Sequence, residues 1–375
     1  MEPFELSGTG VLLATPTVDD VDEITRICQD PDVQRWTTVP VPYRRHHAEE
    51  FVGMAAQRWT HGQELTWAVR DPDTRAVLRM VGVNVTSPGS AEVGYWLGPA
   101  ARRRGLMTTA VRLVTEYAFA PEGLGMHRLV WKAAVGNWAS RRLAWRLGFR
   151  IEGTVRSELV QRGERRDAWV ATLLPGDPTG PSQPWFEVQT LRGDRVVLRR
   201  WRMSDADAAV EGCTDPVTRH WLGHLPHPYT RQVALEHIAS RETEHASGRG
   251  VHWAAALDDE GDAVGSLSLM HIDESEPGGP DSAEIGYWMH PAARGQGVAT
   301  AAVRLVVVHA LAPVTDGGLG LRRLTLAHAA GNEASRAVAP RAGFRPFGVG
   351  RSAVHLGDGS YADLHWYDLM ASDPR

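Results

Sequence analysis

The sequence predicts two successive copies of one mixed α/β domain, each with helices packed on a central sheet. Three observations support this fold class. The chain has 375 residues, about twice the length of a common single domain. Long segments of its first half recur in the second half in the same order. A stretch rich in proline and glycine separates the halves, so we expect domains at 1–176 and 186–375 and a linker at 177–185.

The repeat is clearest in the middle of each half. Residues 91–113 and 283–305 align without a gap and share 15 of 23 residues. The pattern Asn-x-x-Ser-Arg follows in both halves, at 137–141 and at 332–336. A repeat of this length indicates a duplicated domain and not a solenoid of short units. We therefore expect both halves to fold alike.

The first part of each copy is expected to run strand, helix, strand, strand. A polar capping residue and an acidic first turn, followed by apolar residues at helical spacing, indicate the helix. Runs rich in apolar and β-branched residues on either side of a proline-containing turn indicate the strands. The expected elements are a strand from Val11, a helix after Thr17 that carries Val21, Ile24 and Ile27, and strands at 65–69 and 80–85.

The second part of each copy contains the most informative segment. A strand is expected there to lead through a short glycine-bearing loop into a helix with one apolar face. Asparagine is a strong helix N-cap, and glycine commonly follows a helix end. The expected elements are a strand at 91–97, a loop at 102–105, a helix with Met107, Ala110, Val111, Val114 and Ala118 on one face, a strand at 128–134, a helix from Asn137 to Gly148, and closing strands from Phe149, from Val155 and over 168–174.

The loop before the second helix is a candidate phosphate site. It reads Arg-Arg-Arg-Gly-Leu-Met at 102–107 and Arg-Gly-Gln-Gly-Val-Ala at 294–299. The first backbone N–H groups of a helix have no intrahelical partner, and the helix dipole adds positive charge there, so an anion binds readily. Glycine at 105 and 297 allows a close approach of the backbone. Neither loop fits a Walker or a dinucleotide-binding pattern, and a loop of this kind alone is usually an ordinary turn.

These motifs together resemble the GNAT superfamily of acyl-CoA N-acyltransferases, whose pyrophosphate loop reads Arg/Gln-x-x-Gly-x-Gly/Ala. The segment 294–299 fits that pattern, and the segment 102–107 departs from it at Met107. The chain is also similar to the Rim-type ribosomal-protein alanine N-acetyltransferases in Glu-x-Gly-Tyr-Trp-x-x-x-Pro, in Asn-x-x-Ser-Arg and, in the first copy, in Gly-Phe-x-x-Glu-Gly at 148–153. The second copy lacks the glutamate of this last motif.

The resemblance implies a fold, a reaction and a donor. It implies transfer of an acetyl group from acetyl-CoA to a primary amine by direct attack, with the thioester carbonyl held by a backbone N–H of the strand before the loop. It assigns the donor to a set of loop, strand and helix residues. These are Trp96, Leu97, Arg102, Arg103, Arg104, Gly105, Leu106, Met107, Thr108, Asn137, Arg141, Trp288, Met289, Arg294, Gly295, Gln296, Gly297, Val298, Ala299, Thr300, Asn332 and Arg336.

Two pairs of residues are candidates for catalysis. By resemblance, Ser140 and Ser335 face the sulfur and can protonate the departing thiolate; the alternative is a first-turn serine that only bonds backbone. Glu92 and Glu284 are candidate general bases, because each points away from the face that carries its apolar neighbour. The alternative for these two glutamates is a solvated strand carboxylate.

The acceptor side is harder to define from the sequence. Aromatic and histidine side chains are candidates for its lining, although aromatic residues more often belong to a core. We exclude a zinc site, and expect no metal, because no carboxylate or cysteine is spaced to complete one. The candidates are Trp36, Tyr43, His46, His47 and Trp67 in the first copy and Trp221, His224, His227, Tyr229 and Trp253 in the second.

Composition limits the partners. The net charge of −5 gives no electrostatic basis for nucleic-acid binding, and no apolar run approaches the ~20 residues of a membrane span. No signal peptide is recognisable, and Cys28 and Cys213 are expected to be buried thiols in the cytoplasm. We expect a monomer or homodimer that acetylates a small amine or a protein N-terminus. Open alternatives are a longer acyl-CoA donor, or one copy that serves only as a scaffold or acyl-CoA sensor.

Overall fold

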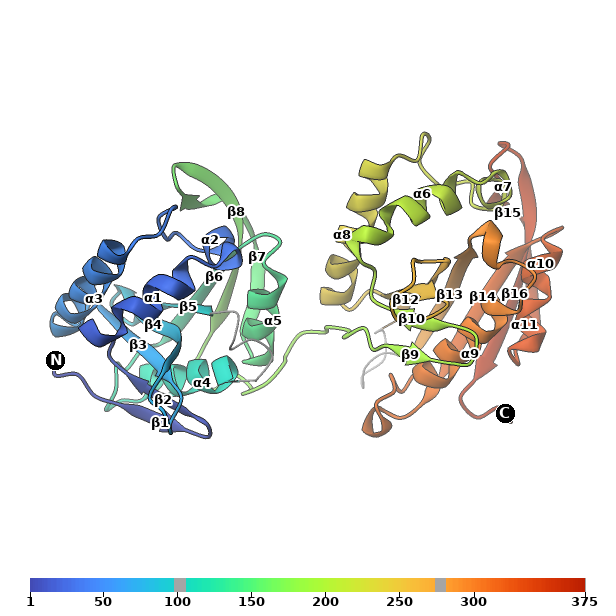
Figure 1. The fold of residues 1–375 in the computed structure, drawn as a ribbon. Helices are drawn as coiled ribbons and strands as arrows, with labels where there is room; N and C mark the ends of the chain where they lie inside the picture. The colour runs from blue at the N-terminus through green and yellow to red at the C-terminus, as the bar shows by residue number, and fades with distance from the viewer. Residues whose placement is uncertain (98–105, 274–280, 375) are drawn as a thin grey trace. The chain divides into compact units, whose positions relative to one another are not determined.

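The computed structural model describes residues 1–97, 106–273 and 281–374 (Figure 1). The chain divides into two compact units, Met1–Gln183 and Pro184–Arg375, so the division falls within the expected linker. Each unit is a mixed eight-stranded sheet with helices packed on it, which confirms the predicted fold class. None of the helices in the described part of the chain is long and apolar enough to cross a membrane.

The first unit begins with two short strands and a group of helices, continues through the central strands, and ends in a long hairpin. Its elements are β1 (Leu6–Gly8), β2 (Val11–Ala14), η1 (Val18–Asp20), α1 (Val21–Cys28), α2 (Pro31–Trp36), α3 (Arg45–Thr60), β3 (Glu64–Arg70), β4 (Val77–Ser87), β5 (Ser90–Leu97), α4 (Leu106–Phe119), β6 (Arg128–Ala134), α5 (Trp138–Arg146), β7 (Arg150–Gln161) and β8 (Glu164–Leu173).

The second unit repeats this order, with its short helices divided differently. Its elements are β9 (Leu191–Arg192), β10 (Val197–Arg199), η3 (Met203–Asp205), α6 (Ala206–Thr214), α7 (Pro216–Trp221), α8 (Arg231–Ala246), β11 (Val251–Ala256), β12 (Gly265–Asp273), β13 (Ser282–Met289), η4 (Pro291–Ala293), α9 (Val298–Leu311), η5 (Val314–Asp316), β14 (Arg323–Ala329), α10 (Glu333–Arg336), α11 (Val338–Arg341), β15 (Arg345–His355) and β16 (Tyr361–Met370).

Both sheets have the same topology. The strand order is β1-β2-β3-β4-β5-β6-β8-β7 in the first unit, and the second unit has the matching order β9-β10-β11-β12-β13-β14-β16-β15. Neighbouring strands are antiparallel except for one central pair in each unit, β5 with β6 and β13 with β14. The parallel pair is joined through the glycine-bearing loop and the long helix that follows it.

The parallel pair separates before its strands end, and this opening positions the site. In the first unit the pairing stops at Val93 and Trp131, whereas β5 continues to Leu97 and β6 to Ala134. In the second unit it stops at Ile285 and Leu326. The strand ends beyond these residues have no partner strand on that side. A ligand can therefore reach main-chain N–H and C=O groups in the middle of the sheet.

Two apolar clusters hold the first unit together, one on each face of its sheet. On one face all five apolar residues predicted for the helix at 107–118 are buried on α4, with Trp131 and Phe149 beside them. On the other face α1 buries Val21, Ile24 and Ile27 against α3. Burial of this apolar surface is the main driving force for the layered fold. Cys28 and Cys213 are buried free thiols, as expected.

Several predicted elements were incomplete or wrong. The sequence analysis gave no helix for the region of α2 and α3, although α3 buries Ala48, Val52, Ala55 and Trp59 at helical spacing. Separate strands from Phe149 and Val155 do not exist, since β7 is one strand. Its pairing with β8 is irregular around Ser157, which has a φ of 55°. The bulge bends the strand without ending it.

Candidate active site

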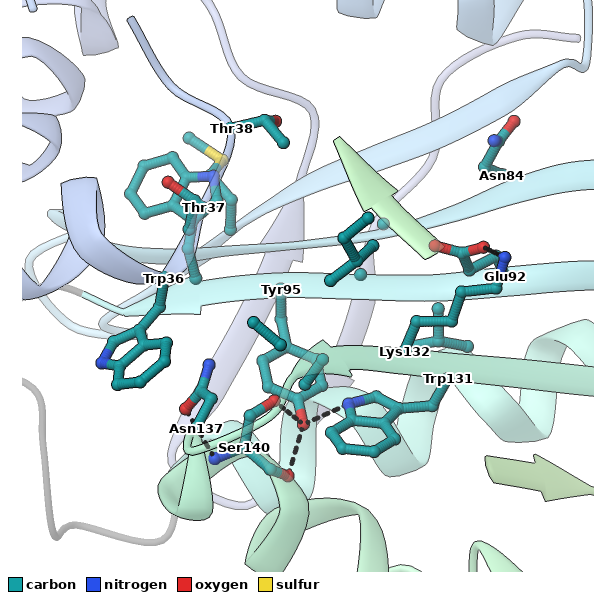
Figure 2. A pocket seen from close by; sticks show the side chains of 18 of the residues that line it. Trp36, Thr37, Thr38, Asn84, Glu92, Tyr95, Trp131, Lys132, Asn137 and Ser140 are labelled. Atoms are coloured by element: carbon teal, nitrogen blue, oxygen red, sulfur yellow. Dashed lines mark hydrogen bonds and ion pairs between the residues drawn. The ribbon is translucent and has the colours of Figure 1, made fainter. Parts of the chain in front are cut away.

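A cavity of about 410 Å³ lies in the first unit where β5 and β6 separate (Figure 2). Its lining comes from the end of α2, the strands β3 to β6, the start of α5 and the β7–β8 hairpin. Of the predicted site residues, the cavity gathers Glu92, Trp96, Asn137 and Ser140. The size is within the range of small-molecule binding sites.

A hydrogen-bonded trio occupies the separated end of the strands. Ser140 Oγ donates to the hydroxyl oxygen of Tyr95 at 3.1 Å, and Trp131 Nε1 donates to the same oxygen at 3.0 Å. The Tyr95 hydroxyl in turn donates to the Ser140 carbonyl oxygen at 3.1 Å (Figure 2). Burial raises the pKa of Tyr95, so its proton is retained at neutral pH. The Ser140 hydroxyl therefore bonds a side chain and not only the backbone.

The start of α5 holds Ser140 in place. The Asn137 side chain caps the helix and accepts from the Ser140 N–H at 3.3 Å. Gly136 precedes the cap with a φ of 96°, and a Cβ built there would lie 3.4 Å from the Trp36 ring. Glycine is therefore required for both the turn and the close approach of Trp36. The predicted capping role of Asn137 is confirmed.

Glu92 belongs to an ion-pair network on the opposite strand face from the buried Val93, as its alternation predicts. Lys132 Nζ lies 3.4 Å from Glu92 Oε2 and 2.6 Å from Glu158 Oε1. The hydrogen bond to Glu158 raises the pKa of Lys132, and the same contact lowers the pKa of Glu158. The shorter contact shows that Glu158 is the main partner of Lys132, which leaves Glu92 more available to a ligand.

The structure describes only some of the first-unit residues that were predicted to bind the acetyl-CoA donor. Arg102, Arg103, Arg104 and Gly105 lie outside the described residues, as does the Leu97 side chain. Leu106 and Thr108 are partly exposed at the start of α4, whereas the Met107 side chain is buried in the core. Arg141 lies over the rings of Trp138 and Trp169, at 5.2 and 4.6 Å from their centroids. Burial lowers the pKa of Arg141.

The second unit shows the whole glycine-bearing loop. Gly295 and Gly297 have left-handed φ values of 72° and 77°, and a Cβ built at either would meet nothing within 4 Å. Gly297 is the N-cap of α9 and offers no side chain to the first N–H groups. Val298 is buried, and Ala299 and Thr300 are partly exposed. Free space above left-handed glycines at a helix start fits a pyrophosphate.

Arg294 is oriented differently from the prediction of a phosphate contact. Its Nη2 donates to Asp215 Oδ2 at 2.6 Å and to Thr218 Oγ1 at 2.7 Å, and its Nε donates to the Met289 carbonyl at 3.1 Å. Gln296 Nε2 donates to the Ala292 carbonyl at 2.6 Å. Both side chains thus bond protein groups, so they hold the loop to its surroundings and leave the backbone to face a ligand.

The catalytic candidates of the second unit repeat part of the first-unit arrangement. Tyr287 and Ser335 share a hydrogen bond of 2.8 Å between their hydroxyl oxygens, and Asn332 accepts from the Ser335 N–H at 3.1 Å. Burial raises the pKa of Tyr287 to about 12. Glu284 Oε2 lies 3.1 Å from His271 Nδ1. Arg336 forms an exposed ion pair with Glu333 at 3.0 Å.

Trp288 and Met289 occupy the end of β13. Trp288 packs so closely on α6 that a Cβ built at Gly212 would lie 2.3 Å from its ring, and Met289 is buried in the core. Both side chains therefore contribute to the packing of the second unit.

The aromatic and histidine candidates for the acceptor side occupy different kinds of position. Of the first-unit candidates, Trp36 lines the cavity. Trp221 has the matching place in the second unit, at the end of α7, with its ring 3.6 Å from a Cβ built at Gly331. Tyr43, Trp67, Tyr229 and Trp253 are buried, because α3, α8 and the strands β3 and β11 cover them. His46, His224 and His227 are exposed on the surface, and His47 accepts a hydrogen bond from the Arg44 N–H at 3.0 Å.

Four residues of the site were not predicted from the sequence. Trp131, the third member of the hydrogen-bonded trio, lies in the strand expected at 128–134 but was not singled out. Tyr95 was considered only for its backbone, although Gly-Tyr-Trp recurs in both halves. Lys132 is the only lysine of the chain, which is itself a signal. Glu158 meets Lys132 from 26 residues away, and no spacing rule reveals such a partner.

Comparison with known proteins identifies the family. Residues 11–150 and 195–345 each match the family described as acetyltransferase (GNAT) domain. A candidate ribosomal N-acetyltransferase of Bacillus subtilis, YdaF, is 39% identical over 84 residues, which are 22% of this chain and 45% of that protein. The alignment thus spans under half the length of that relative.

Solved structures are similar at lower identity. A ribosomal-protein-S5-alanine acetyltransferase from Vibrio fischeri is 16% identical, with a TM-score of 0.42 over 46% of this chain and 98% of its own. The microcin C7 self-immunity acetyltransferase MccE, in complex with acetyl-CoA and AMP, is 18% identical, with a TM-score of 0.41 over 44% of this chain and 93% of its own.

The two family matches cover most of the chain and lie one in each unit. The fold and the site thus define an acyl-group transferase with a duplicated domain. The chain belongs to the GNAT acetyltransferase family, and it is an N-acetyltransferase.

Proposed function

We propose that this protein transfers an acetyl group from acetyl-CoA to a primary amine by direct attack in a ternary complex. The observation that carries the proposal is the serine–tyrosine hydroxyl pair. Ser140 with Tyr95 and Ser335 with Tyr287 stand in both units where the parallel strands separate. The pair lies beside the main-chain groups that the separation leaves free, which is where a thioester carbonyl can bind.

Each catalytic candidate has a distinct role in this proposal. Glu92 or Glu284 takes a proton from the incoming ammonium, so that the amine nitrogen carries a lone pair. The nitrogen then bonds to the carbonyl carbon, the carbon–sulfur bond breaks, and the nitrogen loses its second proton to solvent as the amide forms. The serine hydroxyl gives its proton to the departing thiolate and takes one back from solvent through its tyrosine, while the glutamate releases its own to solvent. The balanced products are an amide, free CoA thiol and one proton.

The donor fits the residues that are described. The backbone of 295–300 would bind the pyrophosphate at the start of α9, and the matching start of α4 at 106–108 would do so in the first unit. Asn137 and Asn332 cap the serine-bearing helices. They stand beside the opening through which the pantetheine arm would pass.

The acceptor is a small-molecule amine or a protein N-terminus. The candidate ribosomal N-acetyltransferase from Bacillus subtilis favours the second class, and the limited volume of the cavity favours the first. A second proposal, that one unit only binds acyl-CoA, gains support from sequence differences. By their register and spacing, Leu326, Ala327 and Ala353 stand in the second unit where the first has Trp131, Lys132 and Glu158.

Release of CoA thiol from acetyl-CoA, measured with a panel of amines on the intact chain, tests the proposal. We expect amine-dependent release that falls in the Ser140→Ala variant, the Ser335→Ala variant or both. Unchanged turnover in both variants would refute the serine roles. Acetyl-CoA binding without release for any amine would instead favour the sensor.

A further inference from the structure

The tip of the β7–β8 hairpin is tied to the end of α2 in the first unit. Gln161 Nε2 donates to the carbonyl oxygens of Thr37 at 2.5 Å and Arg35 at 3.0 Å. Arg162 Nη1 donates to the Val39 carbonyl at 3.2 Å. We call these contacts of Gln161 and Arg162 with the carbonyls of 35, 37 and 39 the tip bridge. It joins parts of the chain that are more than 120 residues apart.

The bridged carbonyl groups need hydrogen-bond donors. Arg35 lies in the last turn of α2, where carbonyl groups have no intrahelical partner and carry partial negative charge, and Thr37 and Val39 lie in the chain that follows the helix. The amide N–H₂ of Gln161 and the guanidinium of Arg162 supply the donors. Arg166 adds to the bridge, because its Nη1 donates to the Arg35 carbonyl at 3.3 Å and to Gln161 Oε1 at 2.8 Å.

Both sides of the tip bridge line the cavity. Trp36, Thr37 and Thr38 line it from the α2 side, and Leu159, Val160 and Gln161 line it from the hairpin. In Figure 2 the α2 residues stand at one end of the drawn side chains, and Glu92 with Lys132 at the other. The bridge therefore forms part of the cavity wall at the end away from the ion-pair network.

Trp36, which is part of this wall, is held in place by neighbouring groups. The Arg166 guanidinium lies 5.6 Å from the centroid of the Trp36 ring, and the ring packs against Gly136 beside the cap of α5. Trp36 is therefore fixed between the hairpin and the loop that carries Asn137. A polypeptide acceptor would need a gap in this wall for the rest of its chain, whereas a small amine would not.

We propose that the tip bridge sets the acceptor class of the first unit, restricting it to small primary amines and excluding peptide and protein N-termini. The inference rests on the proposed acetyl transfer and adds to it the residues that select the acceptor. Gln161 and Arg162 act as specificity-determining residues, because they decide whether the wall between α2 and the hairpin is closed.

The second unit closes the same place in another way. Leu356 stands where Gln161 stands and is buried, and the Gly357 N–H donates to the His220 carbonyl at 2.8 Å. Glycine is needed there, because a Cβ at Gly357 would lie 2.1 Å from the Arg219 carbonyl oxygen. The side-chain bridge is thus a property of the first unit, and its removal changes one site of the two.

Thiol release tests the inference with two acceptors, n-butylamine and a lysine-free peptide with a free N-terminus. The intact Ser335→Ala chain is the parent protein, because it lacks the proposed acid of the second unit, and we expect it to prefer the amine in kcat/KM. When Gln161→Ala/Arg162→Ala is added, kcat/KM for the peptide should rise about tenfold relative to that for the amine, the size of effect that one or two net hydrogen bonds produce. An unchanged thermal unfolding transition shows that the variant folds.

Arg165→Ala is the matched control, because Arg165 is an exposed neighbour whose Nη1 donates to the Ser157 carbonyl at 2.9 Å and not to α2. It should leave the ratio of the two acceptors unchanged. A Ser335→Ala parent that prefers the peptide, or a double variant in that parent with an unchanged ratio while the amine still turns over, would overturn the inference alone. Absence of release with either acceptor in the wild type would overturn the proposed function as well.

Discussion

The two units share a fold but surround their catalytic candidates differently. In both, a serine and a tyrosine share a hydrogen bond where the parallel strands separate. The first unit adds Trp131 as a third member and pairs Glu92 with Lys132. The second unit has an exposed histidine beside Glu284 and a buried histidine cluster elsewhere. The duplication therefore retained the arrangement that we propose acts on the thioester, and changed the surroundings that we propose act on the amine.

Among the variants that distinguish the two units, substitution of the serines should change kcat most. Ser140→Ala removes the proposed acid of the first unit, and general acid catalysis contributes about 10²- to 10⁴-fold to a rate. We expect kcat to fall by that order if the first unit does the work, with KM for acetyl-CoA little changed. The same measurement on Ser335→Ala assigns the remaining turnover to the second unit. Equal losses in both would show two working sites.

The glutamates should give the next largest effect. Glu92→Gln keeps the side-chain size and removes the proposed base, so we expect kcat/KM for the amine to fall about 10²-fold. Glu284→Gln should lower only the turnover that belongs to the second unit. Raising the pH supplies neutral amine without a base, and should recover activity in Glu92→Gln. A pH profile identical to wild type would argue against the base assignment.

The loop glycine tests donor binding without touching catalysis. Gly297 has a φ of 77°, and the strain on a β-carbon there is about 1 kcal/mol or more. Gly297→Val also places a side chain in the space proposed for pyrophosphate, so affinity for acetyl-CoA in the second unit should fall about tenfold or more. Gly317→Val is the control, because Gly317 has a φ of 80° and equally open surroundings. Calorimetric titration of acetyl-CoA distinguishes the two variants.

Acid should destabilise the second unit before the first. Burial, with Arg241, His245 and His237 nearby, lowers the pKa of His252 to about 2 from a usual value of 6.5. The folded state keeps this side chain neutral, whereas the unfolded state takes up a proton below pH 6.5, so stability is lost as the pH falls below that value. Each pH unit below 6.5 costs about 1.4 kcal/mol, or about tenfold in amide protection.

Hydrogen exchange of the intact chain between pH 7 and pH 5 measures this loss. Thr66 occupies the position of His252 in the first unit, so His252→Thr is a suitable test variant. It should reduce the loss of protection at low pH, and the part that comes from His237, whose pKa burial lowers to about 4, should remain. Parallel loss of protection in both units of the wild type would contradict the role of His252.

The fold was predictable because the repeat placed matching strands, caps and glycines in register. The apolar face of α4 from Met107 to Ala118 was predicted correctly, because its apolar residues recur at helical spacing. The helix α3 was missed because its buried face consists mainly of alanine among polar residues. This pattern gives a weak periodic signal even though Trp59 is fully buried.

The local backbone geometry of the site was predictable from the sequence, whereas the hydrogen-bond partners of its side chains were less so. Asn137 and Ser140 follow from a local motif, so their geometry is set within one helix turn. The direction of Arg294 depends on Asp215, 79 residues away, and the bond from Ser140 goes to Tyr95 on another strand. Such partners are decided by packing, which a single sequence does not display.

The central claim is that each unit is an acetyl-CoA site built on a shared serine–tyrosine arrangement. Calorimetric titration of the intact chain with acetyl-CoA tests it most directly. The account predicts two binding events per chain, one of which is weakened by Gly297→Val. A wild-type stoichiometry of one, or the absence of binding, would contradict the account.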